Sequence, residues 1–267
     1  MSKQKIKSVF IKIEWFLSSQ LGLNLRIFFL ALRGVPKFLY DLFLFRRTYE
    51  GRMGLMPCLH DWYEEAGVTK SEYFWQDLFV SQLVNLANPE RHVDVGSRID
   101  GFVAHIASFR DCEVFDVRPI DATIPRITFR QANVMDSESL PANLSAGYCD
   151  SLSCLHAIEH FGLGRYGDPL SPKGYQFGIY NMVKLLRRNG VFYLSAPIGV
   201  ERVEFNAHRV FDPREIVLVT INAGMSLQKL FVIDPTHGPE PVPIDADAIA
   251  RLASHNYQLG LFVFKKV

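Results

Sequence analysis

The chain has 267 residues, which is enough for one large α/β domain with an appendage. Its apolar content of 48% and formal net charge of +1 exclude an intrinsically disordered protein, and they give no sign of general nucleic-acid binding. The four cysteines form no C-x-x-C pair, and two of them fall in predicted buried strands. We therefore expect reduced core cysteines and a cytoplasmic protein.

Residues 1–48 differ from the rest of the chain in charge. Nine Lys and Arg side chains against two acids give this segment +7 and leave the remainder at −6. Apolar residues recur at helical spacing, but charged residues interrupt each apolar run before it reaches the about 18 residues of a membrane span. A secretory signal also fits poorly, because no small-residue cleavage site follows an apolar core. The pattern predicts a basic amphipathic helical appendage.

Two interpretations of this appendage stay open. In the first, it is a helical cap that packs on the α/β domain or on a partner subunit. In the second, it lies peripherally on the anionic inner face of a membrane. Residues 49–88 follow as a helical connector or lid rich in aromatic side chains. Asn88-Pro89 marks the predicted boundary of an α/β domain over residues 89–267.

The stretch 91–102 reads RHVDVGSRIDGF. An apolar run ends in Asp94 and Gly96, a glycine-bearing turn follows, and a helical pattern begins at Phe102. In α/β folds this order of strand, glycine turn and helix holds nucleotide-like ligands. The turn lets the backbone approach the ligand, and the helix N-terminus offers unpaired N–H groups. Glycine turns also occur for packing alone, so the segments downstream decide the interpretation.

Further strands follow along the chain. The second, 112–115, ends at Asp116, an acid about 20 residues after the glycine turn that is placed to bind both ribose hydroxyls of a nucleotide. Helices are predicted at 175–188, closed by Asn189-Gly190, and at 213–222 after an Asp-Pro start. The remaining strands are predicted at 127–129, 151–155, 191–195, 227–233 and 257–264.

Taken together, these segments resemble the class I S-adenosylmethionine-dependent methyltransferases. The matching segments are VDVGSRIDGF, VFDV, FRQANVMDSESLP, YCDSLSCLHAIEH and LLRRNGVFYLSAP, and with the C-terminal strands they cover roughly residues 88–267 in the family's order. The chain also resembles an uncharacterised subfamily of that fold whose members have no assigned substrate. The resemblance implies an α/β fold with a Rossmann-like, mainly parallel seven-stranded sheet, an antiparallel last strand, and S-adenosylmethionine as the cofactor.

The resemblance also implies roles for residues at matching positions. The cofactor-binding set is Asp94, Gly96, Ser97, Arg98 and Gly101 at the methionine end, Asp116 and Val117 at the ribose, Asn133 and Val134 at the adenine edge, and Ser153 beside the sulfonium. The family usually has glycines where this chain has Arg98 and Asp100. Arg98 either turns outward, pairs with the cofactor carboxylate, or fills the site and weakens binding.

A second departure is the short spacing between the second and third strands. Only residues 117–126 separate them, and this span contains two prolines. A full helix does not fit there, so we expect one crossover helix to be reduced to a turn and the adenine to be less covered than usual.

His156-Ala-Ile-Glu159-His160 also matches H-x-x-E-H, the inverted zinc-peptidase signature. That chemistry needs a long helix, and the glycines from residue 162 onward would stop a helix almost at once. We therefore expect no metal. In the methyltransferase interpretation, His156 would lie nearest the methyl group, where a neutral imidazole takes a proton from a substrate hydroxyl or amine. The alternative is a polar residue that only lines the pocket.

The charged loop after the fifth strand is the main substrate-binding candidate, because loops at the carboxyl ends of parallel strands carry ligand contacts. It contributes Glu201, Asn206 and Arg209, with His208 as a second candidate base. The loop after the fourth strand adds Arg165 and Tyr166.

The function expected from these observations is methyl transfer from S-adenosylmethionine to a small-molecule or glycan-type acceptor. The alternative is a non-catalytic binding or scaffold protein of the same fold, possibly at a membrane surface. The sequence does not define the oligomeric state.

Overall fold

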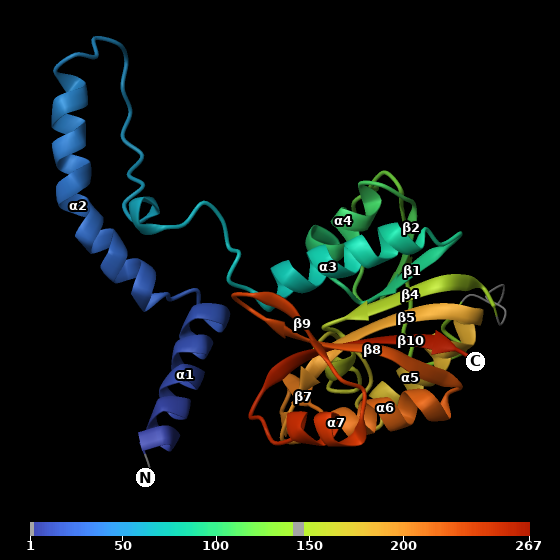
Figure 1. The fold of residues 1–267 in the computed structure, drawn as a ribbon. Coiled ribbons are helices and arrows are strands. Elements are labelled where there is room, and N and C mark those ends of the chain that lie inside the picture. The colour runs from blue at the N-terminus through green and yellow to red at the C-terminus, as the bar shows by residue number, and fades with distance from the viewer. Residues whose placement is uncertain (1–2, 141–146) are drawn as a thin grey trace. The chain divides into compact units, whose positions relative to one another are not determined.

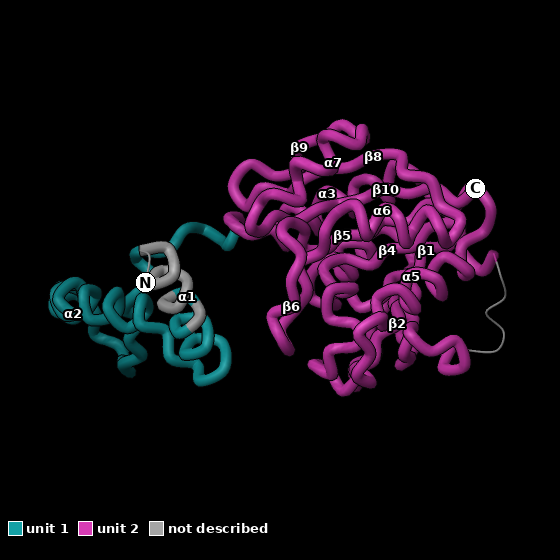
Figure 2. The backbone as a smooth tube through the Cα atoms, turned by 90° about the horizontal axis from the view of Figure 1, so that it is seen from below, with its two compact units in different colours: residues 1–68 teal, residues 69–267 magenta. Residues whose placement is uncertain are grey.

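The computed structural model describes residues 3–140 and 147–267, and the side chains of residues 3–10 and 12 lie outside that description. The chain divides into two compact units, residues 1–68 and residues 69–267 (Figure 2). The connector predicted over 49–88 is therefore divided between the units. Its last part forms a helix that belongs to the second unit because it buries one face against the sheet there.

The described part of the first unit is helical. It contains α1 (Lys3–Gln20), α2 (Leu25–Arg46) and a short 3-10 helix, η1 (Asp61–Tyr63). α2 begins at Asn24, whose side chain accepts a hydrogen bond from the N–H of Ile27. Gly34 packs so closely on the carbonyl of Leu59 that a Cβ atom would overlap it. In the described part of the chain, none of the helices combines the length and apolarity needed to cross a membrane.

The second unit is built around an eight-stranded sheet with the order β3-β2-β1-β4-β5-β10-β8-β9 (Figure 1). Its strands are β1 (His92–Val95), β2 (Cys112–Asp116), β3 (Ile127–Gln131), β4 (Cys149–Leu155), β5 (Leu186–Ile198), β8 (Met225–Asp234), β9 (Gly238–Val242) and β10 (Gln258–Lys266). The first five are parallel, whereas β10 runs antiparallel to both β5 and β8. The predicted mainly parallel sheet with an antiparallel last strand is confirmed.

The sheet has eight strands and not the predicted seven. The additional strand, β9, pairs with β8 as an antiparallel edge strand. It contains Pro239 and Pro241, which lack the N–H needed for a ladder hydrogen bond. An edge strand tolerates proline because one of its sides has no neighbour, and this is why the sequence pattern did not indicate a strand there.

Helices cover both faces of the sheet (Figure 1). They are α3 (Glu72–Ala87), η2 (Ile99–Val103), α4 (Ala104–Ala107), η3 (Ile158–His160), α5 (Gly174–Leu185), α6 (Pro213–Asn222) and α7 (Ala246–Leu252). α3 and α4 pack on one face, where Val80, Val84 and Ile106 are fully buried. α5, α6 and α7 pack on the other around Ile179 and Ile216. Every residue of β1 and β2 is buried because both faces are covered.

Local differences from the predicted elements have local causes. The helix predicted to Arg188 ends at Leu185, because Leu186 already pairs with Cys149 as the start of β5. No helix forms over residues 117–126, as predicted from the short spacing and the prolines. α6 begins at Asp212, whose side chain accepts a hydrogen bond from the N–H of Arg214, and this confirms the predicted start.

Candidate functional site

A cavity of about 500 Å³ lies where β1, β2, β3 and β4 end. Nine of the predicted site residues line it: Gly96, Arg98, Asp116, Val117, Asn133, Val134, His156, Arg165 and Tyr166. They come from the loops that follow four different strands. Because parallel strands end at the same edge of a sheet, the fold gathers segments that are far apart in the sequence.

The turn after β1 needs glycine at two positions for different reasons. Gly96 has φ +74°, a left-handed conformation that side chains with a Cβ rarely adopt. A Cβ atom on Gly101 would lie 2.6 Å from Oδ2 of Asp77 on α3. The side chain that fills this space is therefore a carboxylate from a helix outside the predicted domain.

The two unusual residues of the glycine turn pair with each other. Nε of Arg98 donates to Oδ1 of Asp100 at 3.0 Å, and Nη2 donates to Oδ2 at 2.7 Å. The Arg98 guanidinium also lies 5.8 Å from the ring centroid of Tyr73. The Arg98 side chain is 58% exposed, so it borders the cavity from the outside and does not fill it.

Asp94 lies beneath the turn and is fully buried. Its carboxyl group accepts hydrogen bonds from the N–H and the hydroxyl of Ser97 and from the hydroxyl of Ser153. Burial raises its pKa to about 7, although these hydrogen bonds act in the opposite direction. Asp94, Ser97 and Ser153 thus support the turn from below. Within the described part of the chain, these three and Gly101 are not among the residues that line the cavity.

Asp116 ends β2 at the cavity, and Arg118 already contacts it. The backbone N–H and Nε of Arg118 donate to Oδ1 at 2.8 and 2.9 Å, and Nη2 donates to Oδ2 at 2.5 Å. The same guanidinium lies 4.6 Å from the ring centroid of Tyr166. A carboxylate offers about four lone-pair positions, so Oδ2 can accept a further hydroxyl donor.

Asn133 and Val134 follow β3 and form the wall at the predicted adenine edge. Oδ1 of Asn133 accepts a hydrogen bond from the N–H of Met135, and its own N–H donates to the hydroxyl of Ser139. The carbonyl of Val134 accepts from the side chain of Asn181. These bonds fix the loop, and they occupy the backbone N–H of Asn133 within the chain.

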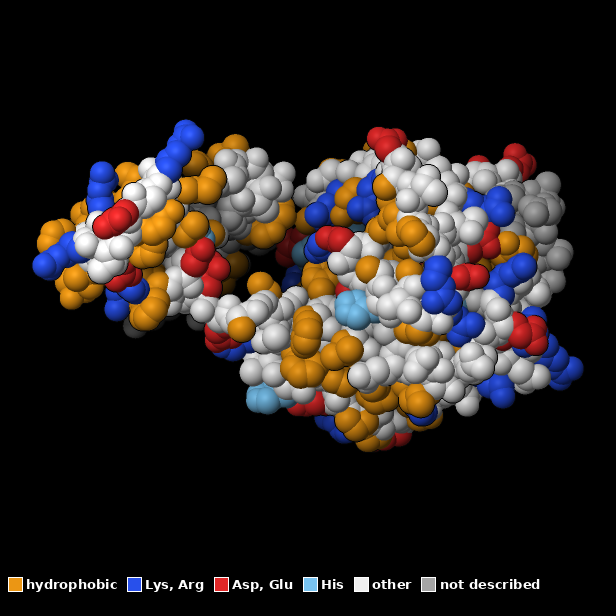
Figure 3. Space-filling model, turned by 90° about the horizontal axis from the view of Figure 1, so that it is seen from above, with side chains coloured by type: hydrophobic (Ala, Val, Ile, Leu, Met, Phe, Trp, Pro, Cys, Tyr) orange, Lys and Arg blue, Asp and Glu red, His pale blue; other side chains and the backbone are white. Residues whose placement is uncertain are grey.

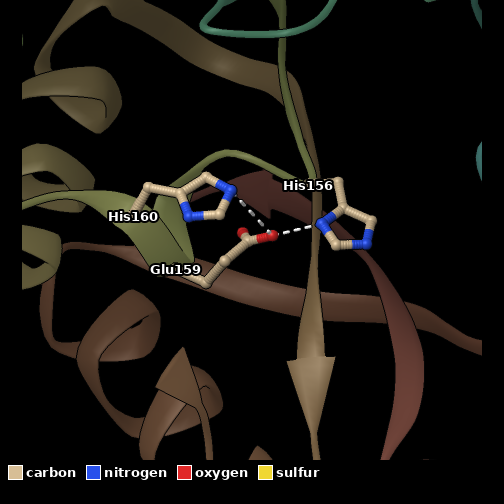
Figure 4. A group of neighbouring side chains, drawn as sticks. All are labelled: His156, Glu159 and His160. Carbon is tan, nitrogen blue, oxygen red and sulfur yellow. Dashed lines mark hydrogen bonds and ion pairs between the residues drawn. The ribbon is translucent and has the colours of Figure 1, made fainter. Parts of the chain in front are cut away.

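β4 leads directly into a buried group of three titratable side chains, His156, Glu159 and His160 (Figure 4). Nδ1 of His156 forms a short hydrogen bond with Oε1 of Glu159, and its Nε2 lies 3.9 Å from Oε2 of Glu72. Burial alone would lower the pKa of His156, but the two carboxylates raise it to about 10. In this arrangement the ring is protonated at pH 7, and it is not the neutral base that the sequence suggested.

His160 has a different environment. Its Nδ1 lies 2.7 Å from the carbonyl of Ala207, and its Nε2 lies 3.7 Å from Oε1 of Glu159. Burial lowers the pKa of His160, whereas Glu159 opposes that shift. η3, the 3-10 helix that carries these residues, is only three residues long and ends at Phe161. The long helix of a zinc peptidase is therefore absent from this segment, as the sequence predicted.

The predicted substrate loop folds into a small hairpin, β6 (Arg202–Glu204) and β7 (His208–Val210). Glu201 and Asn206 are exposed, and burial lowers the pKa of the half-buried His208. Within the described residues, the lining of the cavity does not include Glu201, Asn206, His208 or Arg209.

Arg209 is buried and connects two loops. Its guanidinium donates hydrogen bonds to the carbonyls of Glu159, Phe161, Ser171 and Pro172. The first two carbonyls lie on either side of His160 in the chain, and the other two precede α5. Arg209 therefore holds the loop after β4 in place, which is a structural role beside its predicted contact with substrate. Arg165 and Tyr166 do line the cavity, and Nη1 of Arg165 donates to the carbonyl of Ala207 at 2.9 Å.

Sequence reasoning missed one wall of the cavity, which α3 supplies. Tyr73, Gln76 and Asp77 line it, and the Tyr73 ring stacks on His156 with centroids 4.6 Å apart. The sequence pattern that could have indicated this wall is a polar Gln-Asp pair inside an aromatic run, on the side of α3 that carries Val80 and Val84. Arg118 was also missed, because its partner Asp116 was considered only as a ligand contact.

The strand order, with one antiparallel strand between β5 and β8, is decisive for the fold class. The second unit has the class I methyltransferase fold. Residues 142–267 match the model of a family described as Caenorhabditis protein of unknown function, DUF268. No curated protein matches the chain.

The chain also matches solved structures at low sequence identity, among them several methyltransferases and the [4+2]-cyclase SpnF. The 1,6-didemethyltoxoflavin-N1-methyltransferase of Burkholderia thailandensis is 15% identical, with a TM-score of 0.49 over 78% of this chain and 81% of that one. The O-methyltransferase of a trans-AT polyketide synthase from Brevibacillus brevis is 12% identical, with a TM-score of 0.49 over 72% and 71%. The N-methyltransferase NodS of Bradyrhizobium japonicum is 12% identical, with a TM-score of 0.46 over 70% and 93%.

Proposed function

We propose that this chain binds S-adenosylmethionine and transfers its methyl group to a small-molecule acceptor. The observation that carries the proposal is the convergence of Gly96, Asp116 and Asn133 on one cavity, each from the loop after a different parallel strand. The cavity volume of about 500 Å³ falls within the about 300–1,000 Å³ of small-molecule sites. When bound, the cofactor supplies an electrophilic methyl group on a sulfonium.

The residues present fit such a cofactor. Gly96 lets the backbone approach the methionine end, and the exposed Arg98 is free to rotate from Asp100 toward a carboxylate. Oδ2 of Asp116 has the capacity to accept a ribose hydroxyl while Arg118 keeps its bond to Oδ1. Asn133 and Val134 form the adenine wall. The proposed acceptor region is the part of the lining that follows β4, with Arg165, Tyr166 and His156.

His208 is the candidate base for proton removal from the acceptor. Burial favours the neutral form of His208, which suits a base, but this side chain lies behind the cavity lining. We expect His208→Ala to lower turnover without changing cofactor affinity if His208 accepts the proton. Equal turnover of the variant and the original chain would exclude His208 as the base. Alignment of the acceptor would then be the chain's main contribution to catalysis.

Calorimetric titration of the full chain with S-adenosylhomocysteine tests the proposal. Asp116→Asn should weaken binding by about 1–3 kcal/mol, because ribose hydroxyls lose a charged acceptor. Asp212→Asn is a matched control, since Asp212 also accepts from the N–H and guanidinium of an arginine two residues on. Absence of heat at millimolar ligand would refute cofactor binding and favour the scaffold interpretation. If the chain binds the cofactor but does not consume S-adenosylmethionine in the presence of a cytoplasmic small-molecule extract, methyl transfer is refuted and only cofactor binding stands.

We also propose that α2 rests on anionic membrane surfaces. Phe28, Phe29, Leu39 and Phe43 are exposed on it, and basic side chains lie among the apolar ones of residues 1–68 (Figure 3). This combination suits the boundary between headgroups and acyl chains. Sedimentation with phosphatidylserine vesicles should show binding that salt weakens, and Phe28→Ser with Phe29→Ser should reduce it. Phe205→Ser, an exposed apolar residue of the second unit, is the control. Binding that is equal for neutral vesicles would contradict the proposal.

A further inference from the structure

We propose that His156, Glu159 and His160 bind a divalent transition-metal ion. One ligand atom from each, an imidazole nitrogen or a carboxylate oxygen, lies within 4.8 Å of the other two (Figure 4). Donors that share a Zn²⁺ ion each lie about 2.0–2.2 Å from it, so they are at most about 4.4 Å apart. The ion would replace the proton between Nδ1 of His156 and Oε1 of Glu159, and these two atoms would move apart to admit it.

The outer nitrogen of each imidazole already has a partner. Nδ1 of His160 donates to the carbonyl of Ala207, which leaves its Nε2 as the lone-pair nitrogen on the side of Glu159. Nε2 of His156 faces Glu72, whose Oε2 also accepts a hydrogen bond from the hydroxyl of Tyr257 at 2.8 Å. Metal-binding histidines are typically oriented in this way, by a carbonyl or a carboxylate on the second nitrogen.

Glu159 has one carboxylate oxygen bonded to His156 and one that is available to a further ligand. Its side chain is fully buried, and within the described residues its Oε2 has no hydrogen-bond partner. A buried carboxylate oxygen without a partner is costly, and a cation bound by both oxygens of Glu159 would remove that cost. Binding of the ion displaces the proton on Nδ1 of His156 to solvent.

The donor set defines the class of ion. Two imidazoles and one carboxylate favour Zn²⁺ or another first-row transition ion over Mg²⁺ and Ca²⁺, which prefer oxygen ligands. Three protein ligands leave a coordination position open, and both histidines line the cavity. If the proposed function holds, this position takes an oxygen of the acceptor. The metal site itself does not depend on methyl transfer, and it revises the sequence-based expectation of no metal.

The test is titration of the full, chelator-treated chain with Zn²⁺, Mn²⁺ and Mg²⁺ by calorimetry. We expect one equivalent of Zn²⁺ to bind at micromolar or lower Kd and Mg²⁺ to bind far more weakly. Glu159→Gln and His160→Gln should each weaken Zn²⁺ binding by at least about tenfold. Co²⁺ in the original chain should give visible absorption bands of a histidine-ligated site, which keeps the test decisive if the buried variants fail to fold.

His60→Gln is the control variant, because His60, Asp61 and Glu64 form a second group with metal-like spacing, two of them exposed. Its Zn²⁺ affinity should equal that of the original chain. Loss of Zn²⁺ binding in His60→Gln, or unchanged binding in both Glu159→Gln and His160→Gln, would overturn the proposal. S-adenosylhomocysteine titration in the presence of chelator reports separately on the cofactor, so failure of one proposal is distinguishable from failure of the other.

Discussion

The cavity has two sides that are built in different ways. On the cofactor side, which comprises the loops after β1 and β2, charged groups pair with residues two or three positions away, as in Arg98 with Asp100 and Arg118 with Asp116. On the histidine side, the loop after β4 contacts residues 47 or 48 positions away, as in His160 with Ala207 and Phe161 with Arg209. The charged pairs of the proposed cofactor side are thus local, although Asp94 beneath them accepts a hydrogen bond from Ser153, 59 residues away. The loop after β4 on the histidine side depends on contacts with the distant hairpin β6-β7.

The sharpest way to test this contrast is Arg209→Met. Its guanidinium donates to four carbonyls, and the side chain is 5% exposed. Loss of these donors leaves buried carbonyls without partners, so we expect a loss of about 3–5 kcal/mol in the free energy of unfolding. Urea denaturation measures it.

Arg214→Met is the control for this variant, because Arg214 is exposed and pairs locally with Asp212. It should change stability by less than about 0.5 kcal/mol. Equal losses in the free energy of unfolding of the two variants would contradict the contrast, because the distant contacts of Arg209 would then stabilise the fold no more than a local surface pair does.

A second test concerns the buried support of the cofactor side, Asp94. Its folded pKa of about 7 lies above the ordinary value of 3.8. Between these values the unfolded chain releases the proton and the folded chain keeps it, so stability falls as pH rises from about 4 to about 7. The pKa difference corresponds to a loss on the order of 4 kcal/mol.

Asp94→Asn removes this titration while it retains a side chain similar in shape to the protonated acid. The stability of Asp94→Asn relative to the original chain should therefore increase from pH 4 to pH 7. The comparison leaves the neighbouring titratable groups unchanged. These are Asp116, whose charge raises the pKa of Asp94, and His92, which is linked to Asp94 through Ser153. Parallel stability curves for the two proteins would contradict the buried-acid interpretation.

The smallest expected effect is that of Arg98→Gly, which introduces the glycine usual at this position in the methyltransferases that the sequence resembles. Because Arg98 is exposed and already paired with Asp100, its contribution to a bound carboxylate is modest. We expect S-adenosylhomocysteine to bind about two- to tenfold more weakly, corresponding to about 0.4–1.4 kcal/mol. Arg126→Gly, which removes a similar exposed pair with Asp111, is the calorimetric control. Tighter binding of Arg98→Gly would show that the arginine obstructs the site.

The positions of the parallel strands along the chain, and the turn residues that follow them, could be predicted from the sequence, whereas their order in the sheet was implied only by the family resemblance. Buried parallel strands appear as apolar runs, and a glycine with φ +74° or an acid at a strand end is a local requirement of the turn it occupies. For the same reason, the absence of a helix over residues 117–126 followed from spacing and proline content alone.

Only the tertiary structure decided which side chains complete the cavity. α3 places the Tyr73 ring on His156. Arg209 donates to carbonyls around η3 and does not line the cavity. Glu72 and Glu159 together raise the pKa of His156. Except for Glu159, these partners lie far from His156 in the sequence, and no local pattern encodes their distance or burial. Chain order and turn chemistry are properties of neighbouring residues, whereas the charge state of a buried side chain depends on all the elements packed around it.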